Sequence, residues 1–393
     1  MKDIVIIANF CMDFSETDNG RFSYLANLLS KNNNVEVITS NFYHITKKYR
    51  EEVKKHPYKI TLVEEPGYKK NICLKRFYSH YIWGKNVGKY LSMRKKPDVV
   101  YCAIPSLTGP FIVAKYCEKK GIRFIIDVQD LWPEAFQMIF NIPIFSNLIY
   151  FPFKYMANSI YKRANQIVAV SQTYVDRVLE VNKKCERGYS IFLGTELKIF
   201  DENSKKNSLL NKPKDEIWLA YCGTLGSSYD LTTVMKAIQL AQIQNLCFIV
   251  MGDGPLMKTF QLLANNLEIN VIFTGRLAYN DMCSILCKCD ITVNPIMPGA
   301  AQSIINKHAD YLASGLPIIN TQENKEIRDL IEEYQCGINC KNANDVDIKN
   351  AIIQLCNNEK LRNEMGKNAR KLANDRFDRA KTYKKIVNLI TEE

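Results

Sequence analysis

Short runs of β-branched and aliphatic residues alternate along the chain with longer segments in which apolar residues recur every three or four positions. Near the start, an apolar run at 4–8 precedes an amphipathic segment from about 19 to 31 and a second run at 35–39. The apolar residues that share one side of the amphipathic segment are Phe22, Leu25, Leu28 and Leu29. Because this spacing places side chains on one helical face, the pattern predicts a strand, a helix and a second strand.

The same alternation continues in two series. The first series has further predicted strands at 98–102, 122–126 and 166–170, with a helix at 107–120. A polar segment without a strand signal, 198–214, separates it from the second series. The second series has predicted strands at 217–222, 246–251, 270–273, 291–293 and 317–320, with a first helix at 231–242. Strands that alternate with helices form parallel sheets covered on both faces, so we predict two doubly wound α/β domains.

At 393 residues, the chain is too long for one ordinary core and long enough for two. We expect a first domain over 1–200, a second over 201–375, and a C-terminal helix within 376–393 that packs back on the first domain. An apolar segment at 136–161 interrupts the alternation, and its prolines, Pro143 and Pro152, exclude a membrane-spanning helix. We interpret it either as buried packing between domains or as an amphipathic element at a bilayer surface.

The net charge of +12 is concentrated in one stretch, because residues 47–96 contain 15 Lys and Arg against 4 Asp and Glu. Aromatic residues are interleaved with these charges: Tyr49, Tyr58, Tyr68, Phe77, Tyr78, Tyr81, Trp83 and Tyr90. This composition is typical of a surface that contacts anionic lipid headgroups, with aromatic side chains at the interface. A nucleic-acid partner and a solvated basic face without a partner are the competing interpretations.

The N-terminal apolar run is short and typical of a first strand rather than a signal peptide, so we expect a cytoplasmic protein. The 13 cysteines follow no disulfide framework, as expected for reduced thiols. Cys283, Cys287 and Cys289 form one cluster. Because the chain has no second Cys or His pair at zinc-finger spacing, we interpret them as structural thiols rather than a zinc site.

A glycine turn is the first candidate for binding chemistry. Gly223 and Gly226 follow a predicted strand and precede a helix. Glycines there let backbone N–H groups approach a diphosphate, and the helix N-terminus favours an anion. An ordinary βα turn without a ligand is the alternative interpretation.

A second candidate is the loop and helix start within residues 299–321. The helix start would direct the Ser303 hydroxyl and the Lys307 ammonium towards a phosphate. Gln302 and Asp310 are eight positions apart, which is about two helical turns, so one could contact a sugar and the other a ribose. The alternative is an amphipathic helix whose polar residues face water.

Five motifs occur in a characteristic order: IIDVQDLWPEAF at 125–136, YCGTLG at 221–226, MGDGP at 251–255, FTGRL at 273–277 and NPI at 294–296. Together they resemble the retaining GT-B glycosyltransferases of family 4, as found in capsule, O-antigen and colanic acid clusters. The resemblance implies two Rossmann-like domains that face each other across a cleft. It also implies that the glycine turn at 223–226 and the motifs near it bind a nucleotide-sugar donor.

The resemblance also implies a role for each matching residue of the second domain. Lys307 would counter the charge that builds on the leaving group, and Arg276 would lie near the nucleotide. Asp310 stands where the second glutamate of the family's E-x7-E motif binds ribose hydroxyls. Gln302 replaces the first glutamate, which puts a charge-based role there in doubt. The implied donor-binding residues are Gly223, Thr224, Leu225, Gly226, Gly252, Gly254, Gln302, Ser303, Asn306 and Asp310.

In the first domain, the resemblance implies that Asn19, Gly20 and Arg21 form a loop over the donor phosphate and the acceptor. Asp127 and Asp130 would be catalytic residues that orient an acceptor hydroxyl at the end of a strand. A helix N-cap is the alternative role for Asp130.

The implied reaction is retaining transfer of a hexose or N-acetylhexosamine from a nucleotide diphosphate donor, by default a UDP-sugar. The acceptor would be a lipid-linked (polyprenyl diphosphate) saccharide of surface polysaccharide biosynthesis, met at the inner face of the membrane. We expect neither a cofactor nor a metal ion, because no Asp-x-Asp motif stands at a strand end.

Two other functions remain open at this point. A non-hydrolysing nucleotide-sugar 2-epimerase shares the two-domain fold but needs acid and base groups, and the chain has only four histidines: His44, His56, His80 and His308. A basic nucleic-acid-binding protein would use the 47–96 stretch. A Rossmann dehydrogenase is disfavoured because no G-x-G-x-x-G follows the first strand.

Overall fold

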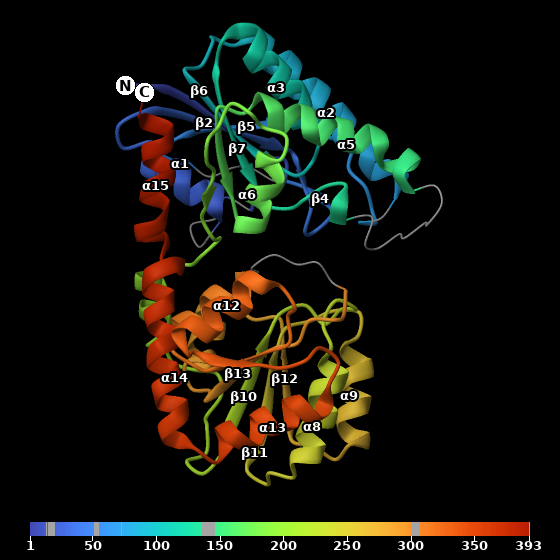
Figure 1. Ribbon diagram of the computed structural model, residues 1–393, viewed down its shortest axis with the longest axis vertical. Helices are drawn as coiled ribbons and strands as arrows, with labels where there is room; N and C mark the ends of the chain where they lie inside the picture. Colours follow the sequence, from blue (N-terminus) through green and yellow to red (C-terminus); the bar gives the residue numbers. More distant parts are fainter. Residues whose placement is uncertain are drawn as a thin grey trace. The chain divides into compact units, whose positions relative to one another are not determined.

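The computed structural model describes residues 1–12, 14, 20–50, 55–71, 73–135, 146–299 and 306–392. The chain divides into two compact units, Met1–Phe192 with Thr382–Glu393, and Leu193–Lys381. The elements of both units are labelled in Figure 1. Each unit is a Rossmann-like α/β layer structure, which confirms the expected fold class. The division falls at residue 192 rather than 200, because β9 is the last element of the first sheet.

A seven-stranded parallel sheet forms the centre of the first unit, in the order β5-β2-β1-β6-β7-β8-β9. Its strands are β1 (Asp3–Ile7), β2 (Asn34–Ser40), β5 (Lys59–Val63), β6 (Val99–Ile104), β7 (Arg123–Val128), β8 (Gln166–Ala169) and β9 (Tyr189–Ser190). A separate antiparallel pair consists of β3 (Phe42–Tyr43) and β4 (Lys48–Tyr49). The central strands are apolar runs that are buried on both faces, as expected for a parallel sheet.

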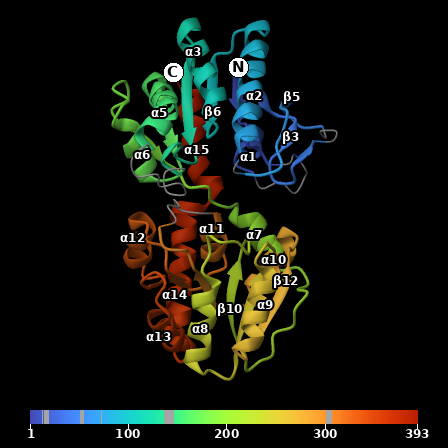
Figure 2. The same cartoon turned by 90° about the vertical axis from the view of Figure 1, so that its right-hand side faces the viewer.

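Helices cover both faces of this sheet (Figures 1 and 2). Its helices are α1 (Arg21–Leu29), α2 (Leu74–Met93), α3 (Thr108–Lys120), α5 (Ser146–Arg163) and α6 (Gln172–Leu179). Helix α3 packs between α2 and α5, whereas α1 joins a core that also contains Tyr383 and Ile386 of α15 (Arg379–Thr391). The C-terminal residues therefore complete the core of the first unit.

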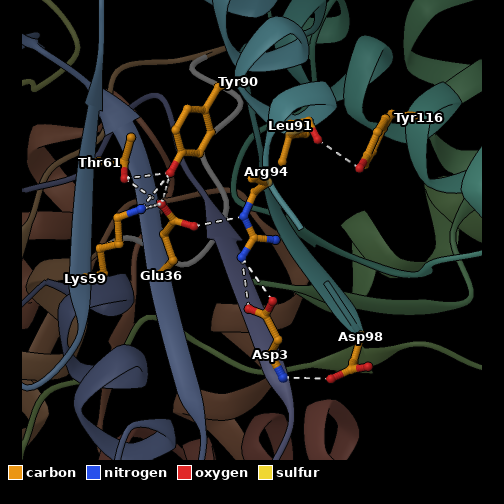
Figure 3. Close-up of polar contacts among 9 residues, drawn as sticks. All are labelled: Asp3, Glu36, Lys59, Thr61, Tyr90, Leu91, Arg94, Asp98 and Tyr116. Carbon is orange, nitrogen blue, oxygen red and sulfur yellow. Dashed lines mark hydrogen bonds and ion pairs between the residues drawn. The ribbon is translucent and has the colours of Figure 1, made fainter. Parts of the chain in front are cut away.

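A buried carboxylate attaches α2 to the sheet (Figure 3). Glu36 of β2 accepts hydrogen bonds from Thr61 and Tyr90 and forms ion pairs with Lys59 at 2.9 Å and Arg94 at 3.1 Å. Burial by itself would raise the pKa of Glu36, but the hydrogen bonds from these partners outweigh it and hold the pKa below its ordinary value. The network fixes the C-terminal half of the basic helix without exposing an acidic group.

The second unit contains a six-stranded parallel sheet in the order β12-β11-β10-β13-β14-β15. Its strands are β10 (Ile217–Cys222), β11 (Leu246–Met251), β12 (Val271–Gly275), β13 (Ile291–Asn294), β14 (Ile318–Asn320) and β15 (Gly337–Asn339). Chain order reverses between β10 and β13. In open α/β sheets, ligands bind beyond the carboxyl ends of the strands at such a reversal. A ligand is therefore expected at the loops after β10, β11 and β13.

Helices cover the second sheet as well. They are α7 (Leu197–Ser204), α8 (Leu231–Ala241), α9 (Met257–Asn266), α10 (Tyr279–Leu286), α11 (Asn306–Ala313), α12 (Lys325–Tyr334), α13 (Asp345–Cys356) and α14 (Glu359–Leu372). Helix α7 corrects the expectation of a structureless linker at 198–214, because Leu197 and Phe200 are buried on one face of it. A π-helical turn (Ala373–Phe377) separates α14 from α15. In the described part of the chain, no helix is long and apolar enough to cross a membrane.

Candidate functional site

The two glycine turns of the second unit are bonded to each other beyond β10 and β11. The N–H of Gly223 donates to the Met251 carbonyl at 2.9 Å, and the N–H of Leu225 donates to the Asp253 carbonyl at 3.0 Å. In return, the N–H of Leu256 donates to the Leu225 carbonyl at 3.0 Å. The residues predicted from 223–226 and from the MGDGP motif therefore form one structure at the sheet reversal.

Close backbone approach explains the glycines. A Cβ atom on Gly252 would overlap the carbonyl oxygen of Gly223, and one on Gly254 would overlap the carbonyl oxygen of Leu225. Two of the four N–H groups that were expected to line a diphosphate are thus engaged within the protein. Among the described residues, the N–H groups of Thr224 and Gly226 have no hydrogen-bond partner, so they are the two that remain available to an anion.

Lys307, the second residue of α11, reaches the first glycine turn. Its Nζ lies 4.3 Å from the ring centroid of Tyr221 and 3.7 Å from that of Tyr229. A Cβ atom on Gly223 would be 3.0 Å from the same Nζ. The Nζ is buried, and no described group forms a hydrogen bond with it. Burial lowers the pKa of Lys307 to about 7.

Tyr221 and Tyr229 were not predicted as site residues. They flank the glycine turn in the sequence, eight positions apart, and a cation beside two tyrosine rings gains cation–π stabilisation. The phenol of Tyr221 donates to the carbonyl oxygen of Thr224 at 2.9 Å, which fixes both the ring and the turn. The arrangement holds an amine without a counter-ion beside two available N–H donors, which is chemistry suited to a phosphate group.

Asp310 lies one helical turn after Lys307. One carboxylate oxygen accepts a hydrogen bond from Tyr279 at 2.8 Å, and the Tyr279 hydroxyl is also 2.8 Å from the Thr195 Oγ1. Burial raises the pKa of Asp310 to about 6, although Tyr279, Arg379 and Thr195 act in the opposite direction. The carboxylate is therefore held in a fixed orientation on the helix that carries Lys307.

The remaining donor-binding predictions fall in different places. Arg276 is exposed and follows Gly275, which forms a bridge with Gly252 and so brings Arg276 to the second glycine turn. Gln302 and Ser303 lie outside the described residues. Asn306 begins α11, but its side chain is not described.

Comparison with known proteins identifies this region. Residues 201–372 match the model of a family described as glycosyl transferases group 1. This segment is therefore similar to the glycosyl transferases of group 1. At the level of this segment, the expected enzyme class is confirmed.

The chain also resembles one curated relative in sequence and several solved structures in fold. The chain is 26% identical over 248 residues to the uncharacterized glycosyltransferase MJ1069 of Methanocaldococcus jannaschii, and the match covers 61% of this chain and 62% of that protein. The chain thus spans less than two thirds of that relative. Anabaena HepE in complex with UDP has the same fold, with a TM-score of 0.71, 15% identity and full coverage of both chains. A putative UDP-N-acetylglucosamine 2-epimerase of Listeria monocytogenes aligns at a TM-score of 0.62 with 12% identity, over 99% of this chain and 96% of its own.

A buried polar cluster positions α11 within the second unit. Asn294, at the end of β13, contacts Asn320 at 3.0 Å and His308 at 3.3 Å, and His308 contacts Gln322 at 3.0 Å. Burial lowers the pKa of His308 to about 4, so this imidazole is neutral. The NPI motif therefore supports the helix that carries Lys307 and Asp310.

The first unit contradicts one expectation. Arg21 and Asp127 are both buried and paired, with Nε to Oδ2 at 2.7 Å and Nη2 to Oδ1 at 3.1 Å. The Nη1 of Arg21 donates to the carbonyl oxygens of Ile191 and Phe192 and to the Tyr383 hydroxyl. Burial opposes the charge, yet Asp127 outweighs it and raises the pKa of Arg21. This burial argues against the expected contacts of Arg21 and Asp127 with substrates and gives the pair a structural role.

Asp130 is half-buried and accepts hydrogen bonds from the N–H of Leu131 at 3.0 Å and the indole N–H of Trp132 at 3.1 Å. Burial raises its pKa. These contacts shape the turn after β7, and both the acceptor contact and the helix N-cap considered for Asp130 stay predictions. Gly20 immediately precedes α1, whereas Asn19 lies outside the described residues.

The cysteine cluster lies around α10. Cys283 and Cys289 are buried, and Cys287 is exposed. All three thiols are free, and burial raises the pKa of Cys283 and Cys289. In the part of the chain that the structure describes, no three His, Cys, Asp or Glu side chains form a group that could hold a metal ion.

Proposed function

We propose that this chain is a retaining glycosyltransferase that moves a sugar from a UDP-sugar to a lipid-linked saccharide at the cytoplasmic face of an anionic membrane. The observation that carries the proposal is the Lys307 ammonium, buried without a partner beside the glycine turn at the sheet reversal. UDP is favoured as the nucleotide because HepE, which shares the fold, has been solved as a complex with UDP.

In the proposed reaction, the bond between the sugar C1 and the β-phosphate oxygen breaks while the acceptor oxygen bonds C1 on the same face. The proton of the acceptor hydroxyl passes to the departing phosphate. Lys307 and the N–H groups of Thr224 and Gly226 stabilise the charge on that phosphate. Asp310 would accept a hydrogen bond from the ribose, and Arg276 would add positive charge near the nucleotide. No metal ion is required by these steps, because the protein supplies the cationic and N–H donors.

Membrane binding is proposed for the outer face of α2, α3 and α5 in the first unit. Helices α2 and α5 contain no Asp or Glu, and Phe77 of α2 contacts Phe153 of α5 with ring centroids 5.3 Å apart. Exposed apolar side chains on these two helices, between 47% and 87% exposed, are Leu74, Tyr78, Tyr81, Met93, Phe151 and Tyr155. The three helices also carry exposed lysines: Lys75, Lys85, Lys89, Lys115, Lys119, Lys120, Lys154 and Lys162. Aromatic side chains together with lysines match an anionic lipid surface.

The exposure of Phe151 and Tyr155 favours the bilayer interpretation of the apolar segment at 136–161 over buried packing. Residues 136–145 of that segment lie outside the described residues. Vesicles containing phosphatidylglycerol should pellet the wild-type protein, and Phe151→Ser should weaken this cosedimentation. Leu262→Ser, at an equally exposed apolar residue of α9 in the second unit, is the matched control and should leave it unchanged. Binding to duplex DNA instead of vesicles would support the nucleic-acid alternative.

Thermal stabilisation by nucleotide sugars tests the donor site. Purified protein is melted with UDP-, GDP-, dTDP- and CMP-sugars, and a ligand at 100 times its Kd should add about 2.7 kcal/mol of stability. We expect a shift with the UDP-sugars, lost in Lys307→Ala and retained in Lys258→Ala, a control in α9. An increase in melting temperature of equal size in Lys307→Ala would contradict the proposed donor site.

A 2-epimerase is the alternative with the same fold. It requires acid and base groups at the sugar, whereas His308 is buried in a polar cluster and serves α11. The discriminating measurement is the release of UDP from a UDP-sugar. Release that depends on an added acceptor supports the transferase, whereas inversion of the sugar at C2 without an acceptor supports the epimerase.

A further inference from the structure

A group of basic and aromatic side chains that pack against one another lies in the first unit. We call it the aromatic–basic cluster, and it consists of Phe10, His44, Tyr68, Arg76, His80 and Trp132. Phe10 follows β1, His44 follows β3, Tyr68 follows β5, Trp132 follows β7, and the other two residues belong to the first half of α2. The cluster therefore gathers loops beyond the carboxyl ends of the strands, beside the chain-order reversal between β1 and β6.

The guanidinium of Arg76 is the centre of the cluster. It lies 4.8 Å from the Trp132 ring centroid, 5.4 Å from that of Phe10 and 5.6 Å from that of Tyr68. His80 stacks on Trp132 at 5.9 Å with an interplanar angle of 21°. The rings hold the planar cation in a defined orientation, which is the geometry that presents its N–H groups to one ligand.

Two side-chain nitrogen atoms of the cluster have no hydrogen-bond partner among the described residues. Among the described residues, the Nε of Arg76 and the Nε2 of His80 are buried without a hydrogen-bond partner, whereas the Nη1 of Arg76 donates to the Asn71 carbonyl oxygen at 2.8 Å. His80 itself is only 2% exposed. Buried polar atoms without partners cost free energy, and they are rare in folded proteins unless a ligand uses them.

The electrostatics agree with the geometry. Lys47 lies 5.0 Å from the Tyr68 ring, and its Nζ is 3.2 Å from the Nδ1 of His44. Burial and the neighbouring cations Lys47 and Arg76 lower the pKa of His44 to about 4, and burial with Arg76 and His44 lowers that of His80. Asp130 contributes one nearby negative charge, yet burial and the charge of Arg76 lower the pKa of Lys47, so these two cations still repel each other. A bound anion would relieve this repulsion.

The position of Arg76 and His80 on α2 indicates which anion would bind the cluster. Arg76 and His80 lie on the same helix as Leu74, Tyr78 and Tyr81 of the proposed membrane face, in the same turns. Since a helix with its side chains is about 10–12 Å across, the cluster would lie close beneath the headgroup region. For a lipid-linked acceptor, the anion at that depth is the phosphate that joins lipid and saccharide.

We propose that the aromatic–basic cluster binds the diphosphate of the lipid-linked acceptor, with Arg76 as the principal contact and His80 as a second donor. The inference rests on the proposed function, since it names the group by which that acceptor is recognised. The enzyme would then recognise the acceptor by its diphosphate, which does not react. The saccharide could vary, because the bound diphosphate fixes the position of the acceptor hydroxyl.

Geranyl diphosphate, a short water-soluble isoprenoid diphosphate, is the probe, and its affinity is measured by calorimetry with the donor site saturated by UDP. Arg76→Gln should weaken binding about 10- to 100-fold, the range for loss of a charge-assisted hydrogen bond. Arg76→Lys should restore part of the affinity. Lys307→Ala should bind the probe like the wild type in the absence of UDP. Glucuronate should bind at least tenfold more weakly than the probe.

The outcomes separate the two proposals. Normal UDP binding with equal probe affinity in wild type and Arg76→Gln would overturn the diphosphate assignment and leave the proposed function intact. Tighter binding of glucuronate than of geranyl diphosphate would replace the phosphate by a carboxylate and also overturn it. Absence of UDP binding in the wild type would instead count against the proposed function. Because the Nε of Arg76 has no hydrogen-bond partner among the described residues, Arg76→Gln should melt within a few degrees of the wild type, which thermal unfolding checks.

Discussion

Arg21 and Lys307 are both basic residues next to the first turn of a helix in a Rossmann-like unit, and both belong to motifs that predicted substrate contact. Arg21 donates to a carboxylate, two carbonyls and a hydroxyl. Lys307 has two aromatic rings and no hydrogen-bond partner among the described residues. A buried cation whose N–H groups are all hydrogen-bonded within the protein stabilises the fold, whereas one with no hydrogen-bond partner can bind a ligand. Arg76 is an intermediate case, because its Nη1 donates to the Asn71 carbonyl oxygen while its Nε has no hydrogen-bond partner among the described residues.

The largest expected effect is on the satisfied pair. Asp127→Ala leaves the Arg21 charge buried without its carboxylate, and loss of one partner of a buried ion pair costs about 3–5 kcal/mol of stability. Chemical denaturation measures this loss. The double variant Arg21→Met/Asp127→Leu should recover much of it, because an apolar pair replaces the ion pair. If Asp127→Ala instead folds with normal stability and has lost transferase activity, Asp127 is catalytic and the comparison is wrong.

Lys307→Ala should show the opposite behaviour. Its removal should raise the barrier to sugar transfer by about 2–4 kcal/mol, the range for one preorganised donor to a developing anion. Stability should not fall, since the native ammonium is poorly solvated and unpaired. Steady-state kinetics of nucleotide release and a thermal melt of the same sample measure both quantities. Unchanged turnover, or a loss of activity explained by unfolding, would contradict the assignment; Lys258→Ala is the control.

Glu36 tests whether the rule extends to an anion. Its carboxylate is satisfied by Thr61, Tyr90, Lys59 and Arg94, so Glu36→Gln should cost about 2 kcal/mol of stability without changing UDP affinity. Its native pKa lies below the unfolded value, so its contribution is present above the unfolded pKa of about 4.3 and is lost as the pH falls through the native pKa. Denaturation at pH 7 and pH 3 checks this, because the two proteins should differ less at pH 3.

The sequence predicted the sheets better than the surroundings of the cations. Strands β10 and β11 have the predicted bounds because their apolar runs are uninterrupted. Helix α2 was not predicted, since its buried residues Trp83, Val87 and Leu91 alternate with glycine and lysine. Neither the pairing of Arg21 with Asp127, 106 positions apart, nor the rings beside Arg76 could be read from spacing, because they arise only when the strands assemble.

Long-range contacts also explain why the donor site was predicted only in part. The motif at 221–226 located the turn, and Lys307 lay in the second motif, but the tertiary approach of α11 to Tyr221 and Tyr229 decides that the amine is buried. A sequence pattern indicates which residues can contact a phosphate. The protonation state of the amine depends on its neighbours, and it is the property that pH can test.

The smallest expected effect is the uptake of one proton when UDP binds. Lys307 has a pKa of about 7 in the free protein, below its ordinary value, so it loses its charge as the pH rises from 6 to 8. A bound diphosphate favours the ammonium and raises this pKa, so UDP binding at pH 8 should take up nearly one proton. The affinity should fall by up to about tenfold per pH unit between the two pKa values. Lys307→Arg keeps its charge throughout this range and should lose this proton uptake. Calorimetry in buffers of different ionisation enthalpy measures it, and equal uptake by both proteins would mean that another group carries the proton and that Lys307 was charged before UDP arrived.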